Sequence, residues 1–258
     1  MSGIHHVTAI SGRADRNLDF YTGTLGMRFV KKTVNFDDPG TYHLYYGDEV
    51  GHPGTILTFF PWEHASAGRS GVGFAHQTAF RVPASSLGYW THRLIEKAAP
   101  QEVLEKRFGE SVLAFTDPDG MRLALVGVPE AAAGAGWSNG DVPAEYAIRG
   151  FHGVTLLLSD VAATGAILTD VLGFEKTATE GDQSRRGTAR DGIGLAEVAA
   201  AIHPYQQCVV AEMDKTGRNH IARRRRRQAG DGDHSKAGDA EHNAHDQHRL
   251  RAVRAAAQ

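Results

Sequence analysis

The sequence predicts an α+β protein in which one βαβββ pattern of strands and a helix occurs more than once. The segment GIHHVTAI at residues 3–10 returns as GFHGVTLL at 150–157, and TLGMRFVKKT at 24–33 returns as VLGFEKTATE at 171–180. Four identities lie at one constant offset without a gap: His5 and His152, Thr8 and Thr155, Leu25 and Leu172, Gly26 and Gly173. Self-similarity at a fixed offset indicates a duplication, so the chain is expected to contain repeated structural modules.

The first module can be followed element by element. Residues 4–10 alternate as a strand does, and residues 13–25 carry apolar residues at helical spacing. Gly26 predicts the end of this helix, because glycine tolerates the left-handed conformation that often ends a helix. Three further strands are predicted between segments rich in Asp, Pro and Gly, at residues 27–36, 41–49 and 54–62.

The second module repeats this order. A strand is predicted at 73–82 and a helix at 84–98, where Leu87, Trp90 and Leu94 share one face. Its remaining strands are predicted at 103–108, 110–116 and 121–128, with the turn DPDG at 117–120 before the last of them.

A linker and a third module are predicted next. Residues 129–148 turn to Ala, Gly, Pro and Ser, which is typical of a linker. A strand at 150–158, a helix at 161–172 and a strand at 174–179 then open the third module. Beyond this strand the pattern fades.

Composition narrows the class of protein. The 258 residues are 41% hydrophobic and 22% charged, as in ordinary globular proteins, and the net charge of −2 gives no reason to expect a nucleic-acid or membrane partner. The single cysteine, Cys208, excludes an internal disulfide and is typical of a reducing compartment. Because no apolar run approaches the roughly 18 residues that span a bilayer and no signal segment follows Met1, we expect a cytoplasmic protein.

These motifs together resemble the vicinal oxygen chelate superfamily, which includes glyoxalase I, bleomycin- and fosfomycin-resistance proteins and extradiol dioxygenases. More narrowly, HHVT followed by LGMRFVKKTVNFDDPGTYHLYYGD resembles its ring-cleaving, hydroquinone-type dioxygenases. In that family four modules form two domains, each a curled sheet around a cavity. The resemblance therefore implies an N-terminal domain of two modules at 1–128, the linker at 129–148 and a partial second domain at 149–222.

The resemblance also implies a metal site of two histidines and one carboxylate that binds Fe(II), with Mn(II) as the alternative metal and O₂ as co-substrate. It assigns the first ligand to His6 and the second to His220 in the segment NHIA. His5, expected on the opposite face of the strand, would orient the ligand or exchange protons. Thr8, expected on the same face as His6, is the other candidate catalytic residue.

Other positions are expected to play no part in the metal site. Gln77 and Gly153 stand at the ligand position of the second and third modules, which matches one site per chain. His152 is expected to be structural, and His43, His52 and His76 to be ordinary residues. The neighbouring aromatic residues are expected to form core and cavity wall: Tyr42, Tyr45, Tyr46, Phe59, Phe60 and Trp62.

The resemblance stops after Ala222. Five arginines follow at 223–227, and residues 223–258 contain no aromatic residue and hardly an aliphatic one. Such a segment cannot fill a core, so we expect a disordered polar tail and a fourth module that is lost together with its glutamate ligand. A shifted reading frame would explain this composition. A nucleic-acid site at the arginine run would need interleaved aromatic residues, which the tail lacks. The histidines of the tail are expected to bind metals only adventitiously: His234, His242, His245 and His248.

The predicted function is therefore an Fe(II)-dependent extradiol-type dioxygenase of aromatic catabolism that cleaves a hydroquinone or related dihydroxylated ring, and that is inactive if the carboxylate is missing. The expected partner is a small aromatic substrate, and formation of a homo-oligomer stays open. Two alternatives remain. One is a non-catalytic protein of the same fold that binds aromatic ligands, and the other is a glyoxalase- or resistance-type metalloenzyme, against which Ala124 argues because it stands where a module-end glutamate would be.

Overall fold

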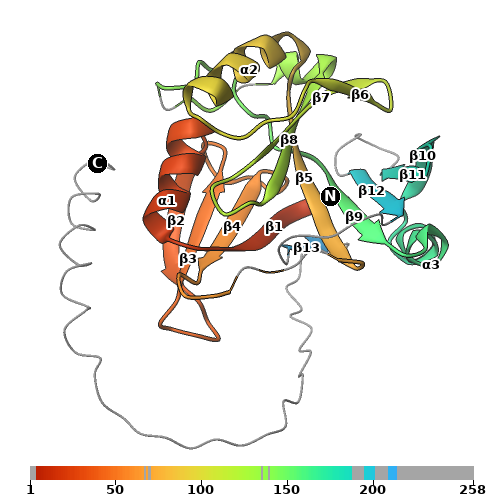
Figure 1. Ribbon diagram of the computed structural model, residues 1–258, viewed down its shortest axis with the longest axis horizontal. Helices are drawn as coiled ribbons and strands as arrows, with labels where there is room; N and C mark the ends of the chain where they lie inside the picture. Colours follow the sequence, from red (N-terminus) through yellow and green to blue (C-terminus); the bar gives the residue numbers. More distant parts are fainter. Residues whose placement is uncertain are drawn as a thin grey trace, which may run out of the picture. The chain divides into compact units, whose positions relative to one another are not determined.

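The computed structural model describes residues 4–66, 68, 71–134, 136–138 and 140–187, together with the backbone of two strands at 195–200 and 209–213 (Figure 1). The chain divides into two compact units, residues 1–218 and 219–258, and all the described residues belong to the first. The predictions for Cys208, for His220 and for the tail lie outside the described residues.

The first module has the predicted order of elements. Its helix α1 continues as a wider π-type segment, η1, and Gly26 follows in the left-handed region with a φ of 68°. The elements are β1 (Ile4–Ser11), α1 (Ala14–Leu18), η1 (Asp19–Thr24), β2 (Arg28–Val34), β3 (Tyr42–Gly47) and β4 (Ile56–Pro61). The second copy of the repeat ends its helix in the same way, because Gly173 has a φ of 72°.

The second module also follows the prediction. It consists of β5 (Phe74–Pro83), η2 (Ala84–Ser86), α2 (Leu87–Glu96), β6 (Glu105–Arg107), β7 (Glu110–Thr116) and β8 (Arg122–Val128). The three residues predicted to share one face of α2 are buried, with Leu87 5% exposed and Trp90 and Leu94 fully buried. Amphipathic spacing therefore located this helix correctly.

The third module contains more strands than the sequence predicted. Its elements are β9 (Phe151–Leu158), α3 (Val161–Ala166), η4 (Ile167–Val171), β10 (Glu175–Glu180), β11 (Gln183–Gly187) and β12 (Leu195–Ala200), and β13 (Val209–Met213) follows. A short helical segment, η3 (Pro129–Ala133), begins the connection from the second module. The pattern of the chain thus continues past residue 180, where the sequence gave no clear signal.

These strands form two mixed sheets, which confirms the α+β class. The first sheet has the order β13-β1-β4-β3-β2, and the second has the order β10-β11-β12-β9-β5-β8-β7-β6. In the second sheet β5 pairs antiparallel with β9 and parallel with β8. In the first sheet β1 pairs antiparallel with β13 and parallel with β4. Hence β13 lies beside β1 as β9 lies beside β5.

The pairing of strands crosses the boundaries between the modules. Residues 1–128 do not form one sheet by themselves, because the second module shares its sheet with the third module across the connection at 129–148. The first module forms the other sheet with β13. Each module is readable from local patterns, but the choice of partner strand depends on contacts between distant residues.

The helices of the first two modules share one core. Tyr21 of η1, Phe59 of β4 and Trp90 of α2 are fully buried in the same hydrophobic cluster. Arg93 of α2 fastens this contact, since its guanidinium donates hydrogen bonds of 2.8 Å to the backbone oxygens of Gly23 and Thr24. The connection at 129–148 joins the same core: Val142 is fully buried, and Arg93 also donates to the backbone oxygen of Asp141 at 3.0 Å.

The turn at 117–120 fastens the second module to the first. The Tyr21 hydroxyl donates to Asp117 at 3.0 Å, and the Asp117 carboxylate also accepts the backbone N–H groups of Asp119 and Met121 at 2.9 and 2.8 Å. Asp119 accepts the backbone N–H of Gly12 at 3.0 Å. Burial raises the pKa of Asp117 to about 6, even though these hydrogen bonds oppose the shift.

A cation is buried on the α3 side of the third module. Arg186 of β11 is 8% exposed and lies against Gly165 of α3. Its Nη1 donates to Ser184 at 2.6 Å, its Nε lacks a partner, and none of the described carboxylates pairs with it. Among the described residues Arg186 therefore has a hydrogen-bond acceptor but no counter-charge, and removing such a charge from water costs folding free energy.

Replacing Arg186 by Met is therefore expected to raise the free energy of unfolding by about 1 to 4 kcal/mol, because an apolar chain of similar length fills the same space without the desolvated charge. Urea unfolding of both proteins measures this. Arg185→Met is the matched control: Arg185 forms an ion pair of 2.7 Å with Glu110, so its loss is expected to destabilise. A loss of stability in Arg186→Met as well would contradict the argument.

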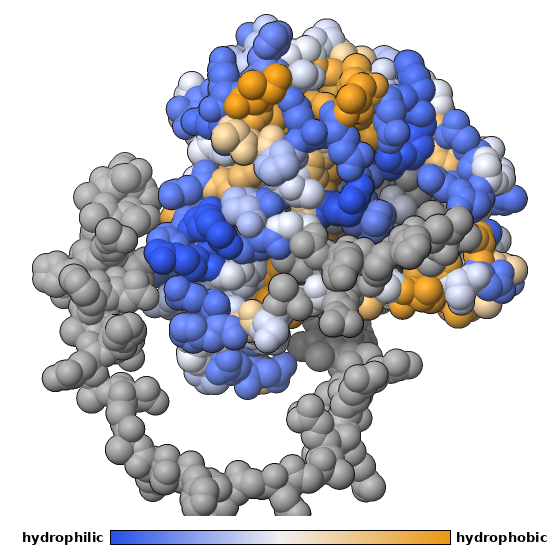
Figure 2. Space-filling model, viewed as in Figure 1, coloured by the Kyte–Doolittle hydropathy of each residue, from blue (hydrophilic) through white to orange (hydrophobic). Residues whose placement is uncertain are grey.

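The surface in the view of Figure 2 mixes hydrophilic and hydrophobic areas, and one of the hydrophobic areas lies over α3. Segment η4, which continues α3, exposes Ile167 and Val171 by 56% and 59%. Within the described residues, none of the helices has both the length and the apolar character that a membrane crossing needs.

Candidate functional site

The predicted residues of β1 lie on the face of the first sheet that points away from the helices. Val7 and Ala9 are buried in the core shared with η1, whereas His6 and Thr8 are half-buried on the other face. Neighbouring strands add side chains that contact Thr8 or one another there. We call this surface the open face and define it by six residues: His6, Thr8, His43, Tyr45, Thr58 and Phe60. Alternation therefore placed His6 and Thr8 together correctly.

The position of His5 differs from the prediction. The register between β1 and β13 shifts between Ile4 and His6, so His5 is the extra residue of a β-bulge. A bulge changes the direction of a side chain, and strict alternation fails there. The rings of His5 and His6 meet edge to face with centroids 5.2 Å apart, and their Nδ1 atoms are 3.0 Å apart. His5 thus contacts the predicted ligand instead of pointing to the opposite face.

The bulge histidine occurs in every module described. Between β5 and β9 the register shifts twice, and the residues skipped are His76 and His152. They precede Gln77 and Gly153, as His5 precedes His6. Sequence reasoning aligned His5 with His152 and treated His76 as an ordinary residue. The shared bulge shows that a histidine at this position belongs to the strand geometry of the module, with or without a second histidine after it.

A chain of hydrogen bonds crosses the open face from β3 to β1. The Tyr45 hydroxyl lies 2.8 Å from His43 Nδ1, and His43 Nε2 lies 2.9 Å from the Thr58 hydroxyl. Thr58 in turn donates to Thr8 at 2.9 Å. Sequence reasoning missed this set. The signal available was the spacing of His43 and Tyr45, two residues apart on a predicted strand and hence on one face.

The surroundings of His43 keep it neutral. Its ring is packed between those of Tyr45 and Phe60, with centroids 4.1 Å away on each. The pKa of His43 is lowered to about 4. Burial is the largest cause, and the nearby His6 and Lys31 add to it. Lys31 Nζ lies 4.4 Å from the centre of the Tyr45 ring. Neutral imidazole and aromatic rings thus dominate this part of the open face.

The corresponding face of the second sheet is filled by ion pairs. Gln77, at the ligand position of the second module, accepts a hydrogen bond of 2.8 Å from Arg107. Glu110 lies 3.2 Å from His152 Nε2 and 2.7 Å from Arg185. Two guanidinium groups beside these positions disfavour binding of a metal cation, since like charges repel at short range in a partly buried site.

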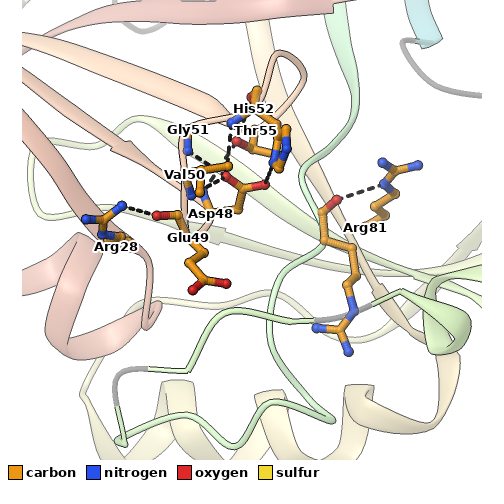
Figure 3. Close-up of polar contacts among 9 residues, drawn as sticks. Arg28, Asp48, Glu49, Val50, Gly51, His52, Thr55 and Arg81 are labelled. Carbon is orange, nitrogen blue, oxygen red and sulfur yellow. Dashed lines mark hydrogen bonds and ion pairs between the residues drawn. The ribbon is translucent and has the colours of Figure 1, made fainter.

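The loop between β3 and β4 holds another carboxylate, drawn in Figure 3. One Asp48 oxygen accepts the backbone N–H groups of Val50, Gly51 and His52, at 3.2, 2.7 and 3.0 Å, and the other lies 2.7 Å from His52 Nδ1. Burial alone would raise the pKa of Asp48, but the hydrogen bonds from His52 and Gly51 outweigh it and lower this pKa. Asp48 therefore stabilises the loop and has little capacity left for a metal.

The predicted metal site is incomplete within the part of the chain that the structure describes. Those residues contain no group of three His, Cys, Asp or Glu side chains placed to hold a metal ion. They supply His6 and its neighbour His5, while the predicted second ligand, His220, lies outside them. The described residues alone thus do not form the two-histidine, one-carboxylate set that Fe(II) takes in oxygenases.

Comparisons with known proteins agree with the fold described above. Residues 3–125 match the family model described as Glyoxalase/Bleomycin resistance protein/Dioxygenase superfamily. The chain is 47% identical over 189 residues to "Putative ring-cleaving dioxygenase MhqO" of Bacillus subtilis, covering 73% of this chain and 60% of that protein. It is 31% identical over 195 residues to the chlorohydroquinone/hydroquinone 1,2-dioxygenase of Sphingobium indicum, covering 74% and 61%.

A solved structure extends the match to three dimensions. The crystal structure of a protein titled "putative dioxygenase" from Bacillus subtilis has a TM-score of 0.73 and 40% identity, covering 80% of this chain and 67% of that one. The chain spans about 60% of the length of the two curated relatives above. Identity at this level over two thirds of a solved relative, together with the family match, shows that the chain belongs to the glyoxalase/bleomycin resistance/dioxygenase superfamily, with the vicinal oxygen chelate fold.

Proposed function

We propose that the protein is an Fe(II)-dependent extradiol-type ring-cleaving dioxygenase that acts on a hydroquinone or a related dihydroxylated ring, with O₂ as co-substrate. The observation that carries the proposal is the open face, where His6 and Thr8 lie beside aromatic side chains on adjacent strands. The relatives named above, one of them a hydroquinone dioxygenase, support the same chemistry. Mn(II) is the alternative metal. The proposal holds for a monomer and for a homo-oligomer.

The described residues have distinct roles in this proposal. His6 would be a metal ligand, and His220 the second. His5, whose Nδ1 lies 3.0 Å from that of His6, would orient the His6 ring by a hydrogen bond. The rings of His43 and Phe60, whose centroids lie 4.1 Å apart, would form part of the wall of a site for an aromatic substrate. The described residues do not complete this ligand set with a carboxylate.

The test is iron content together with oxygen uptake on hydroquinone, using the full chain purified under reducing conditions. Near-stoichiometric iron and uptake, both lost in His6→Ala, are expected. His52→Ala is the matched control, because His52 is exposed and belongs to the loop beyond β3. A folded chain that binds no iron and consumes no oxygen would contradict the proposed activity, as would full activity in His6→Ala.

The second candidate is a non-catalytic protein of this fold that binds aromatic ligands. It is favoured by the incomplete ligand set among the described residues. Hydroquinone that raises the melting temperature of an iron-free, oxygen-inert chain would support it. Glyoxalase-type chemistry is less well supported, because Ala124, fully buried beside Val112 and Val126, leaves no acid at that module end; activity on a hemithioacetal would reverse this order.

A further inference from the structure

The helix of the third module repeats the helix of the first position by position. Both continue as a π-type segment, and two residues after each segment comes a glycine with a positive φ. The backbone N–H of Leu25 donates to the oxygen of Phe20 at 3.0 Å. In the same way the N–H of Leu172 donates to the oxygen of Ile167 at 3.1 Å. Because Leu25 and Leu172 correspond in the repeat, this shared bond makes Ile167 the counterpart of Phe20.

The first module buries one side of this helix, and the third module exposes it. Phe20 and Thr24 are each 7% exposed. Helix α2 packs on their side: Arg93 donates to the backbone oxygen of Thr24 at 2.8 Å, and apolar residues of α2 share the core cluster of Phe20. At the same offset in the third module, Ile167 and Val171 are 56% and 59% exposed. The side that a helix covers in the first module is thus part of the hydrophobic area over α3 in Figure 2.

The exposed side of α3 and η4 lacks the polar character of an ordinary surface helix. A helix at a protein surface usually turns charged and polar residues outward. Residues 161–171 contain a single charged residue, Asp170. Ala163, Ile167 and Val171 are exposed and follow one another at intervals of four, so they lie along one side of the helix. We call these three residues the α3 face. The hydrophobic cluster beneath them consists of residues of the third module.

We propose that the α3 face binds the same face of a second copy of the chain, in a dimer with two-fold symmetry. In the first half of the chain the contact joins the helices of two successive modules, α1 with η1 and α2. Two copies of α3 with η4 reproduce such a pair of module helices, and identical partners make the contact isologous. The helix brings only Asp170 as a charge to this contact, so repulsion between the copies is small. Neither metal nor substrate takes part in it.

The mass of the full chain in solution, measured by light scattering over a range of micromolar concentrations, tests this contact. A dimer that dissociates on dilution is expected. Ile167→Glu is expected to raise its dissociation constant about 100-fold or more, because like charges replace apolar side chains at the contact. Ile95→Glu is the matched control, since Ile95 of α2 is 62% exposed and lies outside the α3 face. A wild-type chain that stays monomeric, or a dimer that Ile167→Glu does not weaken, overturns the proposal.

A mixing experiment identifies the occupant of the α3 face. Ile167 is the middle residue of the face, so in a two-fold contact it meets its own copy. Ile167→Glu and Ile167→Lys are each expected to be monomeric, and a mixture of the two is expected to form the dimer, because opposite charges then meet. A mixture that stays monomeric overturns the contact between copies. A monomeric wild type whose melting temperature falls in Ile167→Glu also overturns it, because part of the same chain then covers the face.

Discussion

Replacing Gly26 by Ala is expected to lower the free energy of unfolding by about 2 to 5 kcal/mol. Gly26 has a φ of 68°, which costs an L-residue roughly 1–2 kcal/mol. An added Cβ would also lie 2.5 and 2.8 Å from two carbons of Val142, which is fully buried, and such overpacking costs about 1–3 kcal/mol. Urea unfolding of the two proteins measures the sum.

Two further variants separate these causes. Gly109 has a φ of 81° with nothing within 4 Å of an added Cβ, so Gly109→Ala isolates the backbone term of roughly 1–2 kcal/mol. Adding Val142→Ala to Gly26→Ala removes the closer contact, with Cγ2 at 2.5 Å, and leaves the one with Cβ at 2.8 Å, so it should relieve only part of the steric cost. The contact between η1 and the connecting segment would be disproved if Gly26→Ala cost no more than Gly109→Ala.

The stability of the wild-type chain is expected to fall by roughly 3 kcal/mol as the pH rises from about 4 to about 6, through Asp117. Burial raises the pKa of Asp117 from 3.8 to about 6 in the folded state. Between these values the folded state binds more protons than the unfolded state, so its stability decreases with rising pH. Asp117→Asn cannot ionise, keeps an oxygen for the N–H groups of Asp119 and Met121, and is expected to remove this decrease.

The comparison is made by urea unfolding at pH 4 and pH 7. Near pH 4 the wild type and Asp117→Asn should be similar, and at pH 7 the variant should be the more stable. Asp117→Ala should be unstable at both, because it orphans two buried N–H groups and the Tyr21 hydroxyl. Tyr21→Phe should keep the pH-dependent decrease, since burial is its main cause; an unchanged pH profile in Asp117→Asn would rule out this assignment.

Most of the elements up to residue 180 could be predicted because their signals are local. The spacing of Leu87, Trp90 and Leu94 on one buried face predicts helix α2. Gly26 and Gly173, both with positive φ, mark the ends of the equivalent helices in the first and third modules. Strand β11 could not be predicted, because QSRRG has no apolar alternation. Arg185 is buried there only because Glu110, from a distant strand, pairs with it, and such a partner is invisible in a local window.

The site divides in the same way. Alternation along β1 is sufficient to place His6 and Thr8 on one face, but it misplaces His5, because the bulge depends on pairing with β13. The links from Tyr45 through His43 to Thr58 join strands in a sheet whose register is set by tertiary packing. His220, the second ligand implied by the resemblance, stays a prediction.

The place of β13 has a consequence for the behaviour of the chain in concentrated solution. A sheet edge with free N–H and C=O groups is a template on which other chains can add strands and aggregate. At one edge of the first sheet, strand β2 carries Lys31 and Lys32 and pairs with β3 in an irregular register. Both features hinder the addition of another strand. The other edge would be β1, an apolar strand, if β13 did not pair with it. With β13 in place the edge on that side is a strand of 5 residues instead of the 8 of β1, and a shorter edge offers a smaller template for self-association.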